Sequence, residues 1–147
     1  MSTGARGADT LARALRAGLD GDHGALADLC TDDVRVWTPG FAASSLDELR
    51  RELDRRDDAF SDVELDVTPL DVRGDYACAE WSASMTHSGP LVLRDDAVVD
   101  PTGLRITLRG VTVAELDGDR ICSLRQYWDE LSALEQLGLL HGEPAPG

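Results

Sequence analysis

The sequence predicts one α+β domain in which helices cover one face of a curved antiparallel sheet, and three observations support this fold class. Apolar residues recur at helical spacing near the N-terminus and again near the C-terminus. Between these segments, after Ser61, the apolar period changes from about 3.6 to about 2, which is typical of half-buried strands. A chain of 147 residues, 42% of them hydrophobic, is long enough to bury one core. We therefore expect a single domain over residues 9–141, with flexible tails at 1–8 and 142–147.

Three helices are expected before the main strands. An apolar stripe from Leu11 to Leu19 predicts the first helix, which ends near Asp20-Gly21. Asp22 is the expected N-cap of a second, short helix. The third begins at Ser45-Leu46-Asp47-Glu48, a capping box in which the serine and glutamate side chains satisfy free amides at a helix start.

The strand predictions follow from alternation and turn residues. The expected strands cover residues 34–37, 63–67, 76–87, 104–116 and 120–128, the last four forming an antiparallel meander. In residues 104–116 the apolar positions switch parity at Gly110, which predicts a bulge there. The long loop 88–103 is expected to form a lid or a mouth. A closing helix follows residue 128, with Leu131, Leu134 and Leu137 inward and Gly138 as its stop.

Charge and composition exclude several classes of function. The net charge of −14, from 28 acidic and 14 basic residues, repels phosphate backbones and anionic lipid, so neither nucleic acid nor a membrane is an expected partner. No apolar run approaches the roughly 20 residues needed to cross a bilayer. The first eight residues also lack the apolar stretch of a signal peptide, so we expect a cytoplasmic protein. Neither the three cysteines nor the histidines have metal-ligand spacing, and no metal is expected.

Four strings, in this order and spacing, carry a family resemblance. They are Val34-Arg35-Val36-Trp37, Thr86-His87-Ser88-Gly89, the segment from Pro101 to Gly110, and Tyr127-Trp128-Asp129-Glu130-Leu131 continuing into residues 135–140. From about Leu11 to Leu140 the sequence resembles the SnoaL-like polyketide (ester) cyclases of the nuclear-transport-factor-2-like superfamily. It departs from them between His87 and Pro101, where residues 91–100 are longer and more acidic than usual, which leaves the identity of the substrate open.

The resemblance implies a cone-like half-barrel with the N-terminal helices packed on its concave face, and a homodimer. It also implies a bacterial enzyme of secondary metabolism that closes a ring on a polyketide-like small molecule by an intramolecular aldol reaction, without metal or organic cofactor. Because one fold hosts many functions, other acid/base reactions stay open: dehydration, isomerisation, spiro- or ether-ring closure, and epoxide hydrolysis. Binding without catalysis stays open as well.

Asp129 is the candidate base, because the family motif has an acid here, at the junction of the last strand and the final helix. The same position suits an N-cap, and the sequence favours neither role over the other. Alternation puts Tyr127 and Arg125 on the same face as Asp129, where they would donate to a substrate carbonyl or orient the acid. The opposite face carries Leu124, Gln126 and Trp128, and the sequence does not decide which face lines the pocket.

The other candidates come from neighbouring strands. His87 is a possible proton relay or donor, with a structural role as the alternative. Arg109 is a candidate for binding an enolate or carboxylate, or for pairing with a surface acid. Trp37, Trp81 and Met85 are candidates for the apolar wall on which a substrate would stack, with ordinary core packing as the alternative.

Overall fold

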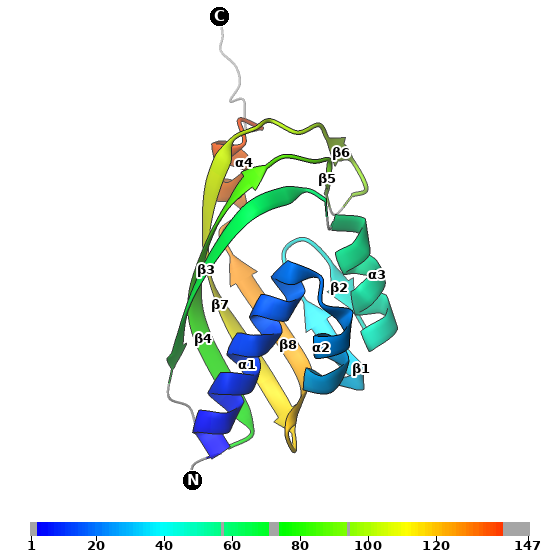
Figure 1. Cartoon of the computed structure of the whole chain (residues 1–147), viewed down its shortest axis with the longest axis vertical. Helices are drawn as coiled ribbons and strands as arrows, with labels where there is room; N and C mark the ends of the chain where they lie inside the picture. Colours follow the sequence, from blue (N-terminus) through cyan, green and yellow to red (C-terminus); the bar gives the residue numbers. More distant parts are fainter. Residues whose placement is uncertain (1–2, 57, 71–73, 94, 140–147) are drawn as a thin grey trace, which may run out of the picture.

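The largest element of the fold is a six-stranded curved sheet with the strand order β2-β1-β8-β7-β4-β3 (Figure 1). The computed structural model describes residues 3–56, 58–70, 74–93 and 95–139. The strands of the sheet are β1 (Cys30–Trp37), β2 (Ala42–Ala43), β3 (Phe60–Leu70), β4 (Tyr76–His87), β7 (Arg105–Asp117) and β8 (Arg120–Trp128). A separate hairpin pairs β5 (Leu91–Val92) with β6 (Val98–Val99). The α+β class predicted from the sequence is confirmed.

Four helices accompany the sheet: α1 (Thr3–Asp20), α2 (His23–Leu29), α3 (Leu46–Arg56) and α4 (Glu130–Gln136). The predicted caps are present, since Asp22 accepts a hydrogen bond from the amide of Ala25 at 3.1 Å and Ser45 accepts one from the amide of Glu48 at 3.1 Å. Helix α1 begins at Thr3, six residues before the predicted start of the domain. The predicted tail 142–147 lies outside the described residues.

The predicted meander is confirmed, because β3, β4, β7 and β8 lie side by side and each pair is antiparallel. The expectation of a wholly antiparallel sheet is wrong for β1, which pairs with β8 in parallel. A hairpin forces its two strands to run antiparallel, whereas β1 and β8 are separated by most of the chain and are free of that constraint. The sheet is therefore mixed.

The predicted bulge at Gly110 is also wrong. Gly110 stays in register with Trp81 on β4 and with Trp128 on β8, and the register shift of β7 against β8 occurs between Glu115 and Leu116. A Cβ atom at position 110 would overlap the ring of Trp81 and the carbonyl oxygen of Tyr127. The glycine is thus required by the close approach of an indole and a neighbouring strand, and β7 keeps a single alternation throughout.

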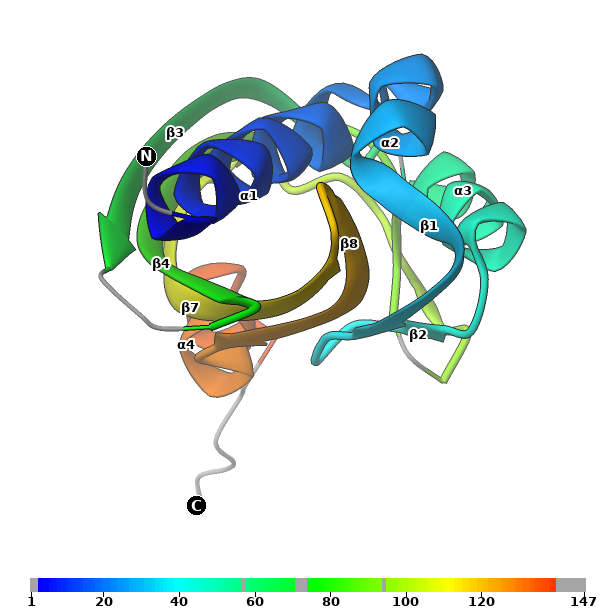
Figure 2. The ribbon, with the colours of Figure 1, turned by 90° about the horizontal axis from the view of Figure 1, so that it is seen from below.

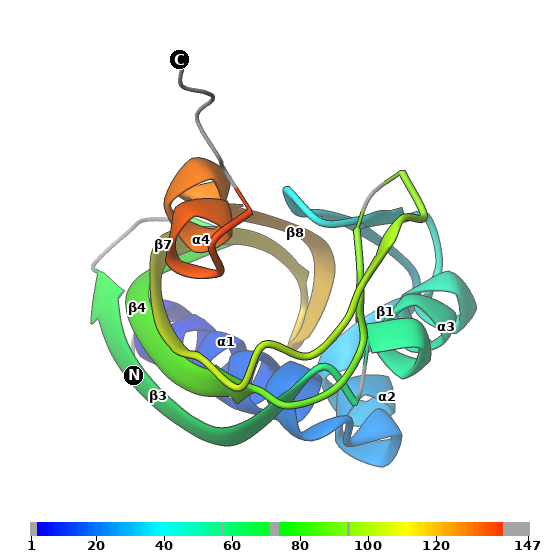
Figure 3. The same cartoon turned by 90° about the horizontal axis from the view of Figure 1, so that it is seen from above.

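The sheet curls around α1, which lies across its concave side (Figure 2). Leu11 and Leu15 of this helix are buried, as are the small inward residues Ala77, Ala79 and Ala83 of β4, which leave room for the helix. Helix α4 and the β5–β6 hairpin lie over the wide end of the cone (Figure 3). Among the described residues no helix has the length and apolar character of a membrane span.

Candidate functional site

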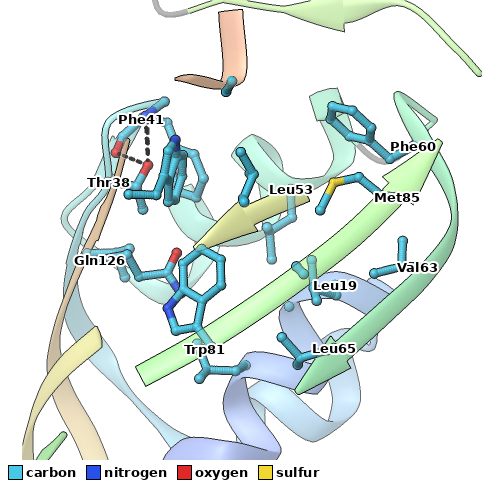
Figure 4. Close-up of a pocket in the computed structure, with 18 of the residues that line it drawn as sticks. Leu19, Thr38, Phe41, Leu53, Phe60, Val63, Leu65, Trp81, Met85 and Gln126 are labelled. Atoms are coloured by element: carbon cyan, nitrogen blue, oxygen red, sulfur yellow. Dashed lines mark hydrogen bonds between the residues drawn. The ribbon is translucent and has the colours of Figure 1, made fainter. Parts of the chain in front are cut away.

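A cavity of about 300 Å³ lies between the concave face of the sheet and the helices. Figure 4 shows side chains from both the sheet and α1 pointing into it. Strand β4 contributes Trp81, Ala83 and Met85, β7 contributes Ile106 and Leu108, and β8 contributes Leu124, Gln126 and Trp128. The wall is mostly hydrocarbon and suits an apolar ligand.

Two tryptophans dominate the sheet side of the cavity, and both of their N–H groups are engaged elsewhere. Trp81 Nε1 donates to the hydroxyl of Thr112 at 2.9 Å, a buried bond that fixes the indole, and Trp128 Nε1 donates to a carboxylate oxygen of Glu130 at 3.0 Å. The two rings meet edge to face with centroids 6.1 Å apart. Since neither indole has a free donor, these rings offer the ligand apolar surface only.

Polar groups at the cavity wall are few. The hydroxyl of Thr38 is committed to its own turn, where it donates to the carbonyl of Phe41 and accepts from the amides of Gly40 and Phe41 at 2.9–3.0 Å. By contrast, the side-chain amide of Gln126 forms no hydrogen bond with the residues that the structure describes, and it points into the cavity (Figure 4). A primary amide supplies both a donor and an acceptor, so Gln126 is the group best placed to hold a ligand carbonyl or hydroxyl.

Glu130 brings a carboxylate to the same cavity. It is the first residue of α4, it follows Asp129 directly, and its bond from Trp128 holds one of its oxygens in place. Among the described lining residues Glu130 is the one carboxylate, and none of them is basic. A carboxylate in this position is a candidate proton acceptor. The described residues contain no group of three or more His, Cys, Asp or Glu arranged to hold a metal ion.

The structure gives Asp129 a helix-capping position. Its side chain accepts a hydrogen bond from the amide of Ser132 at 3.0 Å at the start of α4, it is exposed, and it is not part of the cavity wall. Tyr127 lies on the outer face of the sheet and is 48% exposed. Arg125 and Arg109 are exposed on that same face. These four predicted residues are therefore not brought together around the cavity.

Of the three predicted wall residues, two line the cavity. Trp81 and Met85 do so. Trp37, 41% exposed, packs instead against Tyr127 on the outer face, with ring centroids 5.5 Å apart. In helix α4, Leu134 and Leu137 line the cavity as predicted, whereas Leu131 is 65% exposed, which corrects the expectation that it points inward.

His87 is fully buried next to the cavity but not in its wall. Its Nδ1 accepts from the backbone amide of Thr102 at 3.2 Å, which leaves the proton of the neutral ring on Nε2, and its ring packs against Phe60. Burial lowers the pKa of His87, and an interaction with the backbone of Gly89 opposes this in part. Its contacts fasten the loop after β6 to the end of β4, which is the structural alternative that the sequence left open.

Sequence reasoning missed Glu130 as a candidate and left Gln126 undecided. The signal was the alternation itself, because successive residues of a strand point to opposite faces. The even positions carry Leu124, Gln126, Trp128 and Glu130, and the odd positions carry Tyr127 and Asp129. The parity is decided by the register of Gly110 opposite Trp128, which places Trp128 beside the inward-facing Trp81. That register depends on contacts distant in sequence.

Comparison with known proteins agrees with this architecture. In a structure search the chain matches TsrD from Streptomyces laurentii, with 21% identity, a TM-score of 0.78, and coverage of 95% of this chain and 99% of that one. IdmH from Streptomyces antibioticus, a candidate polyketide cyclase, matches with 22% identity, a TM-score of 0.72, and coverage of 88% and 96%. An LEH-like epoxide hydrolase of M. tuberculosis matches with 17% identity, a TM-score of 0.68, and coverage of 92% of each chain. At such identities these matches establish the shared fold.

Sequence comparison supplies the family. No protein of curated function matches the chain. The profile of the SnoaL-like domain, however, matches residues 11–124, which include the second half of α1, all the strands up to β7 and the first half of β8. The chain therefore belongs to the SnoaL-like domain family.

Proposed function

We propose that this protein is a polyketide cyclase-type enzyme of bacterial secondary metabolism that uses acid/base chemistry and no cofactor. One observation carries the proposal: an apolar cavity of about 300 Å³ whose described wall contains one carboxylate, Glu130, and one uncommitted amide, Gln126. These are the two kinds of group that an aldol closure needs, a base for a carbon-bound proton and a donor for a carbonyl oxygen.

In the proposed reaction the carboxylate of Glu130 removes a proton from a carbon flanked by two carbonyls. The resulting enolate carbon attacks a second carbonyl of the same molecule, which forms the ring C–C bond and an alkoxide. The alkoxide then takes the proton back from Glu130, so that atoms and charge balance without an oxidant or reductant. The amide N–H of Gln126 donates to the carbonyl oxygen on which negative charge develops.

Glu130 replaces Asp129 as our leading candidate for the base. Asp129 is engaged as the cap of α4 and is exposed, whereas Glu130 lines the cavity and is oriented by Trp128. The two carboxylates are adjacent in sequence, which makes them a matched pair for mutagenesis. The helper roles predicted for His87, Tyr127 and Arg109 would require a place at the cavity wall, and we do not propose them.

The test uses a synthetic aryl poly-β-ketone and follows formation of its cyclised product relative to the reaction without protein. We expect Glu130→Gln to lower the rate by about 10²- to 10⁴-fold, as for loss of a general base, and Asp129→Asn to leave it within a few-fold. The reverse pattern would assign the base to Asp129. Full activity in both variants would show that neither Glu130 nor Asp129 is the catalytic base.

A non-catalytic ligand-binding module is the second candidate function. It is favoured by Gln126, because this inward position near the end of β8 carries an amide that does not ionise. If wild-type protein binds the ketone, seen as a change in tryptophan emission, but does not accelerate its cyclisation, the binding module is the correct assignment. Epoxide hydrolysis, the reaction named for one structural neighbour, is less well supported, because it calls for a second carboxylate around the attacking water.

We also propose that the protein forms a homodimer through the outer face of the sheet. Trp37 and Tyr127 pack against each other there with their rings tilted by 39° and about half of each residue exposed. The half-buried Val111 and Val113 lie beside Tyr127 and Arg125 in the sheet register. An exposed aromatic pair beside aliphatic residues is typical of an interface. Sedimentation equilibrium should show a dimer for wild type and a monomer for Tyr127→Arg. If Tyr127→Arg remains a dimer, the interface does not lie at this part of the outer face.

A further inference from the structure

A small hollow of about 60 Å³ lies on the outside of the cone between the end of α1 and the start of β3. It is lined by Arg16, Leu19, Asp20, Val63 and Leu65. Three of these residues, Leu19, Val63 and Leu65, also line the main cavity. The hollow and the cavity therefore lie on the two sides of the same three side chains.

These shared side chains do not seal the wall tightly. Leu19 is 41% exposed and Val63 is 36% exposed, although both belong to the lining of an apolar cavity. Other aliphatic residues of the same lining are nearly inaccessible, among them Leu26, Leu49 and Ile106, which are 2–6% exposed. Figure 4 shows the three of them on the side of the cavity opposite Gln126 and Thr38.

The backbone explains why this part of the wall is thin. Gly18 of α1 lines the cavity, and a Cβ atom added there would meet nothing within 4 Å. Facing it, β3 is the edge strand of the sheet, and its register against β4 shifts between Ser61 and Glu64, with Asp62 in the left-handed region at φ 52°. A glycine on the helix and a bulge on the edge strand together leave a gap that side chains only partly fill.

The wide end of the cone is fastened more firmly. Leu91 and Val92 of the β5–β6 hairpin line the cavity, and the turn of that hairpin is held to α3 by an ion pair between Arg55 and Asp96 at 2.6 Å. At the start of the loop the amides of Ser88 and Gly89 both donate to the carbonyl of Ala59, at 3.0 and 3.1 Å. Entry at this end would break several of these contacts, whereas entry between α1 and β3 would break one long hydrogen bond, from the guanidinium of Arg16 to the carbonyl of Leu65 at 3.4 Å, and rotate the side chains beside it.

We propose that the gap between the end of α1 and the bulged start of β3 is the entrance to the cavity, with Leu19 and Val63 as its gate. The gate side chains are aliphatic and lie across the cavity from the amide of Gln126, whereas the hollow outside them exposes mainly polar surface. The route therefore suits an uncharged molecule that passes a polar rim before it reaches the apolar cavity. Arg16 and Asp20 form a charged rim outside it. This inference rests on the proposed function in one respect, namely that the cavity is the ligand site.

The experiment measures binding kinetics of N-phenyl-1-naphthylamine, a neutral apolar fluorescent probe, by stopped flow. Gly18→Leu adds a side chain beside the gate at a position where a Cβ atom meets nothing within 4 Å, and leucine is the better helix former. Gly24→Leu is the matched control, since Gly24 is an exposed helical glycine that does not line the cavity. Asp96→Asn loosens the hairpin at a position where φ is 66°, which asparagine tolerates well.

We expect Gly18→Leu to lower the association and dissociation rate constants together, each by about tenfold, because a narrowed route raises the barrier in both directions. Gly24→Leu and Asp96→Asn should bind at the wild-type rate. Unchanged rates in Gly18→Leu, or faster binding in Asp96→Asn, would overturn the entrance and leave the cavity as ligand site. If the probe does not bind to wild type, or if Trp81→Phe does not alter its emission, the cavity itself fails as the ligand site and the entrance fails with it.

Discussion

The two faces of the curved sheet carry similar residue types and yet differ in environment. On the inner face Trp81 and Trp128 have their N–H groups engaged and enclose a cavity. On the outer face Trp37 and Tyr127 pack against each other with tilted rings, and 41% and 48% of their surfaces are exposed. An aromatic residue in a strand therefore does not by itself indicate a ligand site, because register decides whether it borders the cavity or the outer surface.

The largest effect should separate the two faces through stability. Trp81→Ala removes an indole that is 9% exposed and leaves a void, so we expect a loss of about 3–5 kcal/mol in the free energy of unfolding. Trp37→Ala removes a half-exposed ring and its stacking on Tyr127, and should cost about 1 kcal/mol. Urea unfolding of both variants measures the difference. Equal losses in the two variants would contradict the assignment of Trp81 to a buried inner face and of Trp37 to an exposed outer face.

A second pair of variants tests the close contact that shapes the inner wall. Gly110→Ala forces a methyl group against the Trp81 ring and the Tyr127 carbonyl oxygen, and should destabilise the protein by about 1–3 kcal/mol. The same substitution at Gly18, where the added atom meets nothing, should stabilise it by up to about 1 kcal/mol. Thermal unfolding reports both signs. Stabilisation by Gly110→Ala would contradict this close contact and would favour the bulge that the sequence predicted.

Asp129 extends the comparison of the two faces to the end of β8, where the chain leaves the sheet. As the cap of α4 it should lose about 1 kcal/mol of stability on replacement by alanine and little on replacement by asparagine, which caps equally well. Chemical denaturation of the two variants distinguishes them. If alanine and asparagine have the same effect, the hydrogen bond to the amide of Ser132 contributes little, and the carboxylate is free for another role.

The smallest effect concerns acid stability and His87. Burial lowers the pKa of His87 below its ordinary value of 6.5. Above pH 6.5 both the folded and the unfolded states hold it neutral, and its contribution to stability is fully present. As pH falls below 6.5 the unfolded chain takes up a proton that the folded state resists, so the free energy of unfolding decreases until the lowered pKa is reached.

The measurement is the slope of unfolding free energy against pH just below 6.5. His87→Gln should flatten this slope. An identical slope in wild type and His87→Gln would show that the buried imidazole is not responsible.

Local signals carried much of the fold. The meander from Phe60 to Trp128 follows from alternation and from the Asp117-Gly118 turn, and the helix starts follow from Asp22 and Ser45, whose side chains bond the amides expected of them. These features depend on residues within a few positions of each other. The parallel pairing of β1 with β8 joins distant segments and has no such local signal.

The site was harder to predict for a related reason. In β7 and β8 both faces carry apolar residues, so Val111 and Val113 imitate an inward row, and Tyr127 is as acceptable an inward residue as Trp128. A one-residue choice of parity moves every candidate to the other face. The apolar positions switch parity at Gly110, which suggested a bulge, because the sequence does not show that the indole of Trp81 fills the space beside this glycine.

The most direct test of the central claim, that the functional face of this sheet is the inner one, is a crystal structure with a bound apolar ketone. We predict electron density inside the cavity, with the ketone oxygen within hydrogen-bonding distance, about 3 Å, of the amide nitrogen of Gln126. Density on the outer face against Trp37 and Tyr127, with no ketone in the cavity, would contradict the account.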